Sequence, residues 1–226
     1  MPTILIVGAS RGIGLALARR YAEGGWRVHA TTRSGEIPVA LVGSSGEVIV
    51  HALDVCDHDQ IDRLKAEVGN QPIDVLIVSA GTYDRVGGPF GNGPPVPSED
   101  VFAINTAAPM NVASAVFKNL TLAPLGKMVF VSSAEGIRAG RQRPMGIYAQ
   151  SKAALNDAVR AHSGQWAHYG VIGIALHPGW VSTDMGSARA PTTPDQCAAG
   201  IMAVVAALTP ADCGIFVDFR GNLLPW

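Results

Sequence analysis

The sequence predicts an α/β protein with a doubly wound, parallel sheet covered by helices on both faces. Strand-like and helix-like segments alternate along most of the 226 residues, as in proteins built from βαβ units. Most of the predicted strands are apolar at successive positions, which is typical of strands that are buried on both faces. There is no internal repeat, low-complexity tract or linker, so we expect a single domain over residues 1–226.

The predicted elements follow from local composition. β-branched and apolar runs predict seven strands, at residues 4–7, 27–31, 47–51, 74–78, 127–131, 171–176 and 215–219. Helical patterns occupy residues 15–23, 59–68, 98–119, 148–168 and 194–208. Ser98 is a candidate N-cap for the third helix, followed by acidic residues that favour a first turn. Glycine and proline crowd residues 82–98 and 134–146, which predicts loops there.

Composition and charge exclude several classes of protein. With 48% hydrophobic and 15% charged residues, the chain can bury a large core and is not disordered. A net charge of −1 provides no field that would attract nucleic acid or a membrane surface. Cys56, Cys197 and Cys213 lack the spacing of a disulfide framework or a metal site, so we expect free thiols and no metal. With no signal peptide and no membrane-length apolar run, we expect a cytoplasmic protein.

A glycine-rich turn joins the first predicted strand to the first helix. Glycine permits a positive φ and a close approach of the backbone to phosphate, and the following helix N-terminus attracts a diphosphate. In this position the turn predicts a Rossmann-type dinucleotide site, whereas the alternative is a structural turn without a ligand. The residues expected to bind the cofactor here are Gly8, Ser10, Arg11, Gly12, Ile13 and Gly14.

The end of the second strand indicates which dinucleotide is bound. Sites that prefer NAD place an acidic residue there, but this chain has none before Glu36 and carries Arg33 instead. Arg33, with Arg11 from the glycine turn, suits the 2′-phosphate of NADP(H). The alternative is that both arginines are solvated surface charges.

Tyr148 and Lys152 are four residues apart, on one face of a predicted helix. Reduction of a carbonyl requires a hydride and a proton, and a nearby ammonium group would lower the pKa of a phenol toward neutrality. A serine at the end of the fifth strand could donate a hydrogen bond to the substrate oxygen, as negative charge develops on it. Both Ser132 and Ser133 are candidates for this serine.

These motifs together resemble the short-chain dehydrogenase/reductase family. The glycine spacing G-x-x-x-G-x-G and the ordered set Asn105, Ser133, Tyr148 and Lys152 match its motifs. Residues 148–156, 177–186 and 219–226 resemble the branch of the C-factor and sniffer-like carbonyl reductases. The resemblance implies an NADP(H)-linked enzyme that interconverts a carbonyl and an alcohol, and that forms a homodimer or homotetramer.

The resemblance also implies roles for individual residues. Asp54 would meet the adenine amino group, although Asp is also common at simple turns. Lys152 would hold the nicotinamide ribose, and Asn105 would position a water that links Lys152 to solvent. Ser133 aligns with the second serine of the family's Ser-Ser-x-x-Gly pattern. The full set of further cofactor contacts is Asp54, Val55, Ala80, Gly81, Tyr148, Lys152, Pro178, Gly179, Val181 and Thr183.

Two questions about function stay open at this level. The chain could instead be an NADP(H)-binding sensor or signalling protein with incidental catalysis, since a fold does not determine a function. The role of three arginines is the second open question, because Arg138, Arg141 and Arg143 could select acidic substrates or could belong to a solvated loop.

The short segment between Asp184 and Pro194 predicts an open, permissive pocket for a small-molecule substrate.

Overall fold

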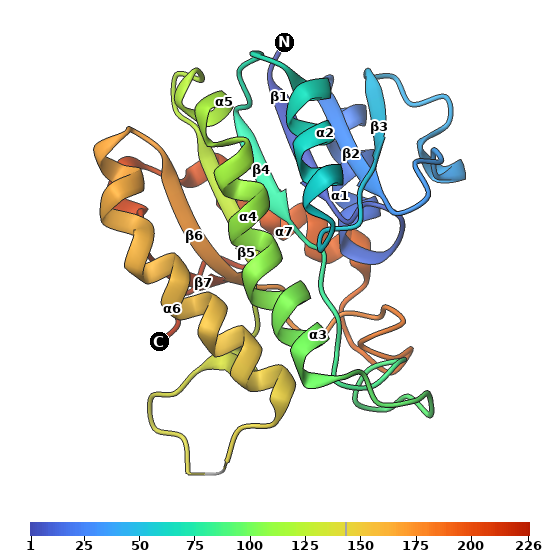
Figure 1. Ribbon diagram of the computed structural model, residues 1–226, viewed down its shortest axis with the longest axis vertical. Helices are drawn as coiled ribbons and strands as arrows, with labels where there is room; N and C mark the ends of the chain where they lie inside the picture. Colours follow the sequence, from blue (N-terminus) through green and yellow to red (C-terminus); the bar gives the residue numbers. More distant parts are fainter. Residues whose placement is uncertain (143) are drawn as a thin grey trace.

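The computed structural model describes residues 1–142 and 144–226 and contains one seven-stranded sheet (Figure 1). Every neighbouring pair of strands is parallel, and the strand order is β3-β2-β1-β4-β5-β6-β7. The predicted fold class is confirmed, and each predicted strand has an observed counterpart. The strands are β1 (Thr3–Val7), β2 (Arg27–Thr32), β3 (Val48–Ala52), β4 (Val75–Val78), β5 (Lys127–Val131), β6 (Ile172–His177) and β7 (Phe216–Asp218).

Helices cover both faces of this sheet because alternate residues of a strand point to opposite sides. Ile4 and Ile6 of β1 pack in one apolar cluster, whereas Leu5 and Val7 pack in the other. The first cluster includes residues of α1 (Gly12–Glu23) and α7 (Pro194–Ala207), and the second includes residues of α2 (His58–Val68), α4 (Ala108–Ala115) and α6 (Ile147–His168).

The third predicted helix is divided into several pieces. It consists of α3 (Ser98–Phe102), a π-helical segment η2 (Ala103–Ala107), α4 and α5 (Phe117–Thr121). The prediction that Ser98 caps this helix is wrong, because Pro97 occupies the N-cap and the Ser98 hydroxyl donates to the Glu99 side chain. Single π turns inside helices are frequent at functional sites, and this one contains Asn105.

The strand order places a crevice between β1 and β4. In the strand order, β2 lies next to β1 toward one edge of the sheet, and β4 lies next to β1 toward the opposite edge. At such a switch point the loops that follow the two strands diverge, which leaves room for a ligand at the carboxyl edge. The glycine turn follows β1, and Ser79, Ala80 and Gly81 follow β4. No helix in the described ranges has the length and apolar character needed to span a membrane.

Candidate active site

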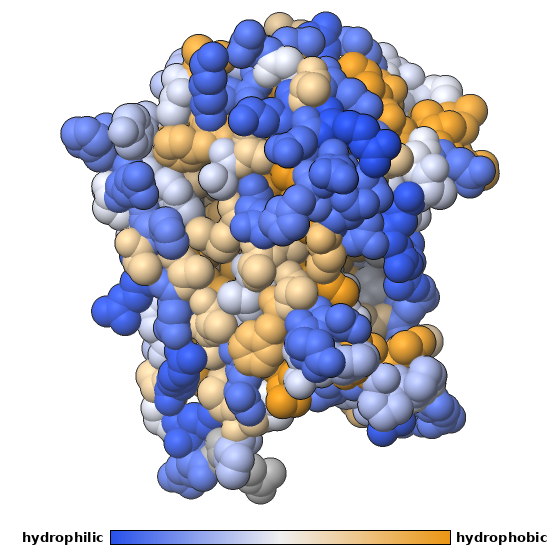
Figure 2. All heavy atoms as spheres, viewed as in Figure 1, coloured by the Kyte–Doolittle hydropathy of each residue, from blue (hydrophilic) through white to orange (hydrophobic). Residues whose placement is uncertain are grey.

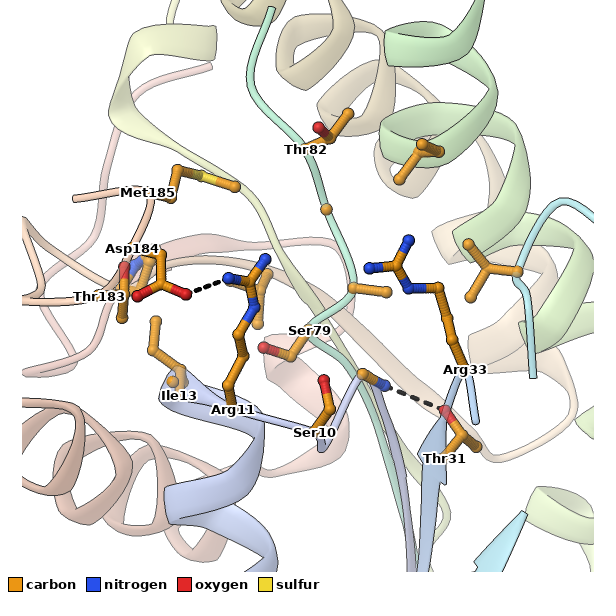
Figure 3. Close-up of a pocket in the computed structure, with 18 of the residues that line it drawn as sticks. Ser10, Arg11, Ile13, Thr31, Arg33, Ser79, Thr82, Thr183, Asp184 and Met185 are labelled. Atoms are coloured by element: carbon orange, nitrogen blue, oxygen red, sulfur yellow. Dashed lines mark hydrogen bonds and ion pairs between the residues drawn. The ribbon is translucent and has the colours of Figure 1, made fainter. Parts of the chain in front are cut away.

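A pocket of about 500 Å³ opens at this carboxyl edge (Figure 3). It brings together residues from the turns after β1, β2, β3 and β4 with residues of β5, α6 and the loop after β6. The predicted site residues that line it are Gly8, Ser10, Arg11, Gly12, Ile13, Arg33, Asp54, Val55, Ala80, Gly81, Tyr148, Lys152, Pro178 and Thr183. Gly14, Asn105, Ser133, Gly179 and Val181 are not among its lining residues.

Ser132, the other candidate for the substrate-binding serine, also lines the pocket. The lining residues that were not predicted from the sequence are Thr31, Thr32, Leu53, Ser79, Thr82, Ile104, Val131, Ser182, Asp184, Met185 and Pro194. Most of them are immediate neighbours of predicted residues. Their position near the ends of strands could have indicated that they line the pocket, whereas no motif did.

The glycine turn requires glycine at each of its three positions. Gly8 has φ +88°, and a Cβ there would lie 2.8 Å from the backbone nitrogen of Ala80. Gly12 also has a positive φ, and a Cβ on Gly14 would overlap the carbonyl oxygen of Gly8. The Gly8 N–H donates to the Thr31 hydroxyl over 3.1 Å, which ties the turn to the end of β2.

This turn leaves the start of α1 suited to an anion. Arg11 occupies the N-cap in an extended conformation, and its side chain makes no capping hydrogen bond. The first N–H groups of the helix therefore remain available to a diphosphate. The backbone geometry fits a dinucleotide that lies across the turn.

Arg11 and Arg33 approach the pocket from opposite sides (Figure 3). The Arg11 guanidinium forms an ion pair with Asp184, and both of these side chains are largely exposed. Arg33 is exposed at the end of β2. Both arginines line the pocket, and Asp184 is a partner of Arg11 that the sequence did not reveal.

Asp54 lies at the pocket in the turn that follows β3. Its carboxylate accepts a hydrogen bond of 3.0 Å from the Cys56 N–H, which is an ordinary turn interaction. The residue is exposed, so its other oxygen remains accessible to a ligand. This geometry is compatible with either role considered above.

Tyr148 and Lys152 are both buried in the first turns of α6. Lys152 Nζ donates to the Val131 carbonyl over 2.9 Å and lies 5.9 Å from the centroid of the Tyr148 ring. Burial lowers the pKa of Lys152 to about 8. A lysine with this pKa exchanges its proton near neutral pH.

The pKa of Tyr148 shifts in the direction opposite to the expectation. Burial raises this pKa, whereas the nearby Ser133 hydroxyl acts to lower it. Loss of hydration of the phenolate is the largest of these effects in this structure, and the lowering of this pKa by Lys152 together with the oxidised nicotinamide stays a prediction.

The two candidate serines have different environments. The Ser132 hydroxyl donates 2.6 Å to Asn156 Oδ1 and lies 3.4 Å from the Lys152 carbonyl, so it is engaged inside the protein. The Ser133 hydroxyl neighbours the phenol of Tyr148 and accepts a hydrogen bond of 3.1 Å from the Glu135 N–H. Because the Glu135 N–H occupies a lone pair, the Ser133 proton remains free to point toward Tyr148 or a substrate oxygen.

Comparison with known proteins identifies the family. The model of the short chain dehydrogenase family matches residues 2–194. The chain belongs to this family. It is 35% identical over 156 residues to the C-signal protein of Myxococcus xanthus, an alignment that covers 69% of this chain and 93% of the relative.

Two solved structures of carbonyl reductases are also similar. An NADPH-bound carbonyl reductase from chicken fatty liver has a TM-score of 0.87 and 28% identity, covering 100% of this chain and 99% of that one. The carbonyl reductase Sniffer of D. melanogaster has a TM-score of 0.85 and 27% identity, with complete coverage of both chains. The resemblance inferred from the sequence is confirmed, including the branch.

In this member of the short chain dehydrogenase family, the Asn105 side chain makes three hydrogen bonds to protein groups. Its oxygen accepts from the Thr82 N–H and its nitrogen donates to the Thr82 carbonyl, each over 2.8 Å. The nitrogen also donates to the Ser151 hydroxyl over 3.0 Å. The amide therefore fastens the loop after β4 to helix α6, and the water-positioning role implied for Asn105 stays a prediction.

One neighbour of Tyr148 was missed by the sequence analysis. The ring of Tyr83 lies 4.4 Å from the Tyr148 ring, with an angle of 32° between their planes. Tyr83 belongs to residues 82–98, which the abundance of glycine and proline marked only as a loop. Tyr83 stands two residues after the Ala80-Gly81 motif, which is expected to lie along the cofactor. This position was the feature of the sequence that could have indicated its place near Tyr148.

The arginine-rich loop after β5 is stabilised mainly by its own contacts. Arg138 pairs with Asp157, and Arg141 donates to the carbonyls of Glu135 and Ile137. Arg143 lies outside the described residues. Arg138 and Arg141 therefore have local partners, which favours the structural interpretation for these two.

Proposed function

We propose that this chain is an NADP(H)-dependent oxidoreductase that interconverts a carbonyl compound and an alcohol. The observation that supports this most directly is the placement of Tyr148 and Lys152 in the same pocket as the glycine turn. The chicken carbonyl reductase, whose fold this chain shares over its whole length, binds NADPH. When bound, NADP(H) supplies or accepts the hydride.

In the proposed cofactor site, the backbone of Gly8–Gly14 and the start of α1 hold the diphosphate. Arg33 binds the 2′-phosphate, and Arg11 contributes when it leaves Asp184. Asp54 and Val55 would bind the adenine, and Ala80 and Gly81 would contact the cofactor between its two ends. The loop that contains Pro178, Gly179, Val181 and Thr183 would hold the nicotinamide, and Lys152 would hold its ribose.

In the proposed reaction, Tyr148 donates a proton to the substrate oxygen during reduction and accepts it during oxidation. Its raised pKa keeps the phenol protonated at neutral pH, which suits the acid role. Lys152, with a pKa of about 8, is the group that can return a proton to the site. Ser133 donates a hydrogen bond to the same substrate oxygen.

We extend the proposal to the setting of the protein. Residues 1–226 form one domain that acts on a small-molecule substrate in the cytoplasm. The chain assembles as a homodimer or homotetramer. Pale and orange side chains gather over the middle of the face that carries α4 and α6 in Figure 2, and this surface would suit such contacts.

The decisive experiment follows NADPH absorbance with a panel of aldehydes, ketones and quinones. We expect turnover by the unmodified protein, and we expect Tyr148→Phe to lower kcat by about 10²–10⁴-fold, the range for general acid–base catalysis. NADPH binding should persist in the variant. Binding without turnover of any substrate by the unmodified protein would instead favour the sensor interpretation.

The cofactor assignment has its own test in Arg33→Ala. A charged hydrogen bond contributes about 1.5–3 kcal/mol, so kcat/KM with NADPH should fall by roughly 10- to 150-fold. The value with NADH should change little, because NADH lacks the 2′-phosphate. A preference of the unmodified protein for NADH would contradict the assignment.

A further inference from the structure

An ion pair at the pocket joins the glycine turn to the loop after β6. The Arg11 guanidinium is paired with the Asp184 carboxylate, and both residues line the pocket (Figure 3). The backbone brings them together, because a Cβ on Gly12 would lie only 3.2 Å from Cγ2 of Thr183. Arg11 and Asp184 are the chain neighbours of these two residues, so the contact between the two turns sets the ion pair in place.

The second arginine of the proposed phosphate site differs in this respect. Arg33 is exposed, and it takes part in none of the ion pairs among the described residues. It can therefore bind a 2′-phosphate without giving up an acidic partner, whereas Arg11 must first leave Asp184. Binding of the same phosphate thus replaces an existing ion pair at Arg11 only.

Hydrogen bonds on both sides of Asp184 fix its place in the loop. The Ser182 N–H donates to the Thr192 carbonyl over 2.8 Å, and the Gly186 N–H donates to the Thr183 hydroxyl over 3.1 Å. The backbone at Asp184 is therefore held beside the glycine turn by contacts that do not involve Arg11. Its carboxylate stays near the guanidinium as an alternative anion when a phosphate enters the pocket.

We propose that Asp184 is a specificity-determining residue for the cofactor, because it competes with the 2′-phosphate of NADP(H) for Arg11. This inference rests on the proposed function. A guanidinium group binds carboxylate and phosphate with the same planar set of donors, so one anion can displace the other. NADH has no phosphate at this position, and its binding leaves the ion pair intact. Asp184 therefore weakens the binding of NADPH alone, which narrows the preference for NADPH that Arg33 provides.

The test measures the Kd of NADPH and of NADH by calorimetry in Asp184→Asn. This variant removes the charge of the side chain and keeps its size. The Kd of NADPH should fall by about two- to fivefold, the fold-change that corresponds to the loss of one exposed ion pair. The Kd of NADH should change by less than about 1.5-fold, since no ion pair is broken when it binds.

A second variant, Arg11→Ala, separates competition from direct repulsion. A carboxylate close to the phosphate could repel it without any contribution from Arg11. Under the proposal, Asp184→Asn strengthens NADPH binding when Arg11 is present and has no effect in the Arg11→Ala background. The loss of NADPH affinity caused by Arg11→Ala should accordingly be larger in the Asp184→Asn protein than in the unmodified one.

Asp157→Asn provides a matched control. Asp157 forms an exposed ion pair with Arg138, and neither residue lines the pocket. The control makes the same chemical change in a pair of the same type, and it should alter neither Kd. The thermal unfolding midpoint of each variant establishes that it is folded.

Three results would overturn the proposal. Unchanged or weaker NADPH binding in Asp184→Asn would mean that Asp184 does not compete for Arg11. An equal gain for NADPH and NADH would mean that its effect is not directed at the 2′-phosphate. An equal gain in the Arg11→Ala background would assign the effect to repulsion. Failure of the unmodified protein to bind NADPH would instead overturn the proposed function itself, and that result is seen before any variant is compared.

Discussion

Two buried polar clusters of this protein differ in their relation to the pocket. In the first, His29 of β2 bonds to His51 of β3 over 2.8 Å, and His51 bonds to Glu67 of α2 over 2.5 Å. In the second, Lys152 donates to the Val131 carbonyl in β5, close to the Tyr148 ring. The histidines are absent from the pocket lining, whereas Lys152 and Tyr148 belong to it.

Burial shifts the pKa of a titratable group in both clusters. It lowers the pKa of His29 to about 4 and the pKa of Lys152 to about 8. Within the part of the chain that the structure describes, His29 Nε2 also has no hydrogen-bond partner. Both clusters should therefore reduce stability, but only the second lies in the pocket, where the proposed reaction would use it. Replacing the buried polar side chains by apolar ones tests the effect on stability and the effect on activity separately.

The largest stability effect is expected from the histidine pair at acidic pH. Because the folded-state pKa of His29 lies below the unfolded value of about 6.5, the unfolded chain binds a proton first as the pH falls. Stability is full above about pH 6.5 and falls by roughly 3 kcal/mol on going to about pH 4. Urea unfolding across this range measures the loss.

The double variant His29→Leu and His51→Leu tests the source of this acid sensitivity. Replacing both partners removes the titration and the unpaired nitrogen, so stability at pH 7 should be unchanged or higher. The free energy of unfolding should then change less steeply between pH 6.5 and 4. The pH dependence that remains should come from His177, whose pKa is also lowered by burial. Activity at pH 7 should be retained. An unchanged slope would show that the histidine pair is not its origin.

Lys152→Met should give a smaller stability gain together with a loss of activity. At pH 7, burial of the ammonium group costs about 3 kcal/mol, and loss of its hydrogen bond to Val131 offsets about 1 kcal/mol. We therefore expect a net gain of about 2 kcal/mol in the free energy of unfolding. NADPH-dependent turnover should fall sharply in the same variant.

The pH dependence of this gain identifies its cause. The folded-state pKa of Lys152 is lowered, so the unfolded chain binds the proton first as the pH falls from about 10.5 to about 8. The advantage of Lys152→Met should be complete below about pH 8 and should disappear above about pH 10.5. A variant that is less stable than the original protein at pH 7 would contradict this account.

The sequence predicted the backbone-determined parts of the site well. Parallel strands, the turn after β1 and the Tyr148–Lys152 pair depend on local patterns, because glycine conformation and helical spacing are set by near neighbours. These patterns sufficed to predict the fold class. Most of the site residues that they indicated line one pocket in the structure. The roles of those residues in binding and catalysis stay predictions.

The contacts that were missed join residues distant in sequence. Arg11 meets Asp184, Asn105 binds Thr82 and Ser151, and Tyr83 packs on Tyr148 only after the sheet has formed. The burial that raises the pKa of Tyr148 could not be predicted from local motifs either, since it depends on the packing of several elements. These contacts and this burial therefore depend on packing between distant parts of the chain, which local motifs do not describe.

The smallest stability effects should distinguish the two adjacent serines. Ser132→Ala removes the donor to Asn156, whose amide nitrogen already lacks a partner among the described residues, so it should cost about 1–2 kcal/mol. Its kcat should remain close to normal. Ser133→Ala removes the cap of a short 3₁₀ turn and the hydroxyl beside the Tyr148 phenol, which should cost about 0.5–1 kcal/mol in stability but should lower kcat markedly. If Ser132→Ala were the inactive variant instead, the assignment of Ser133 to the substrate oxygen would be wrong.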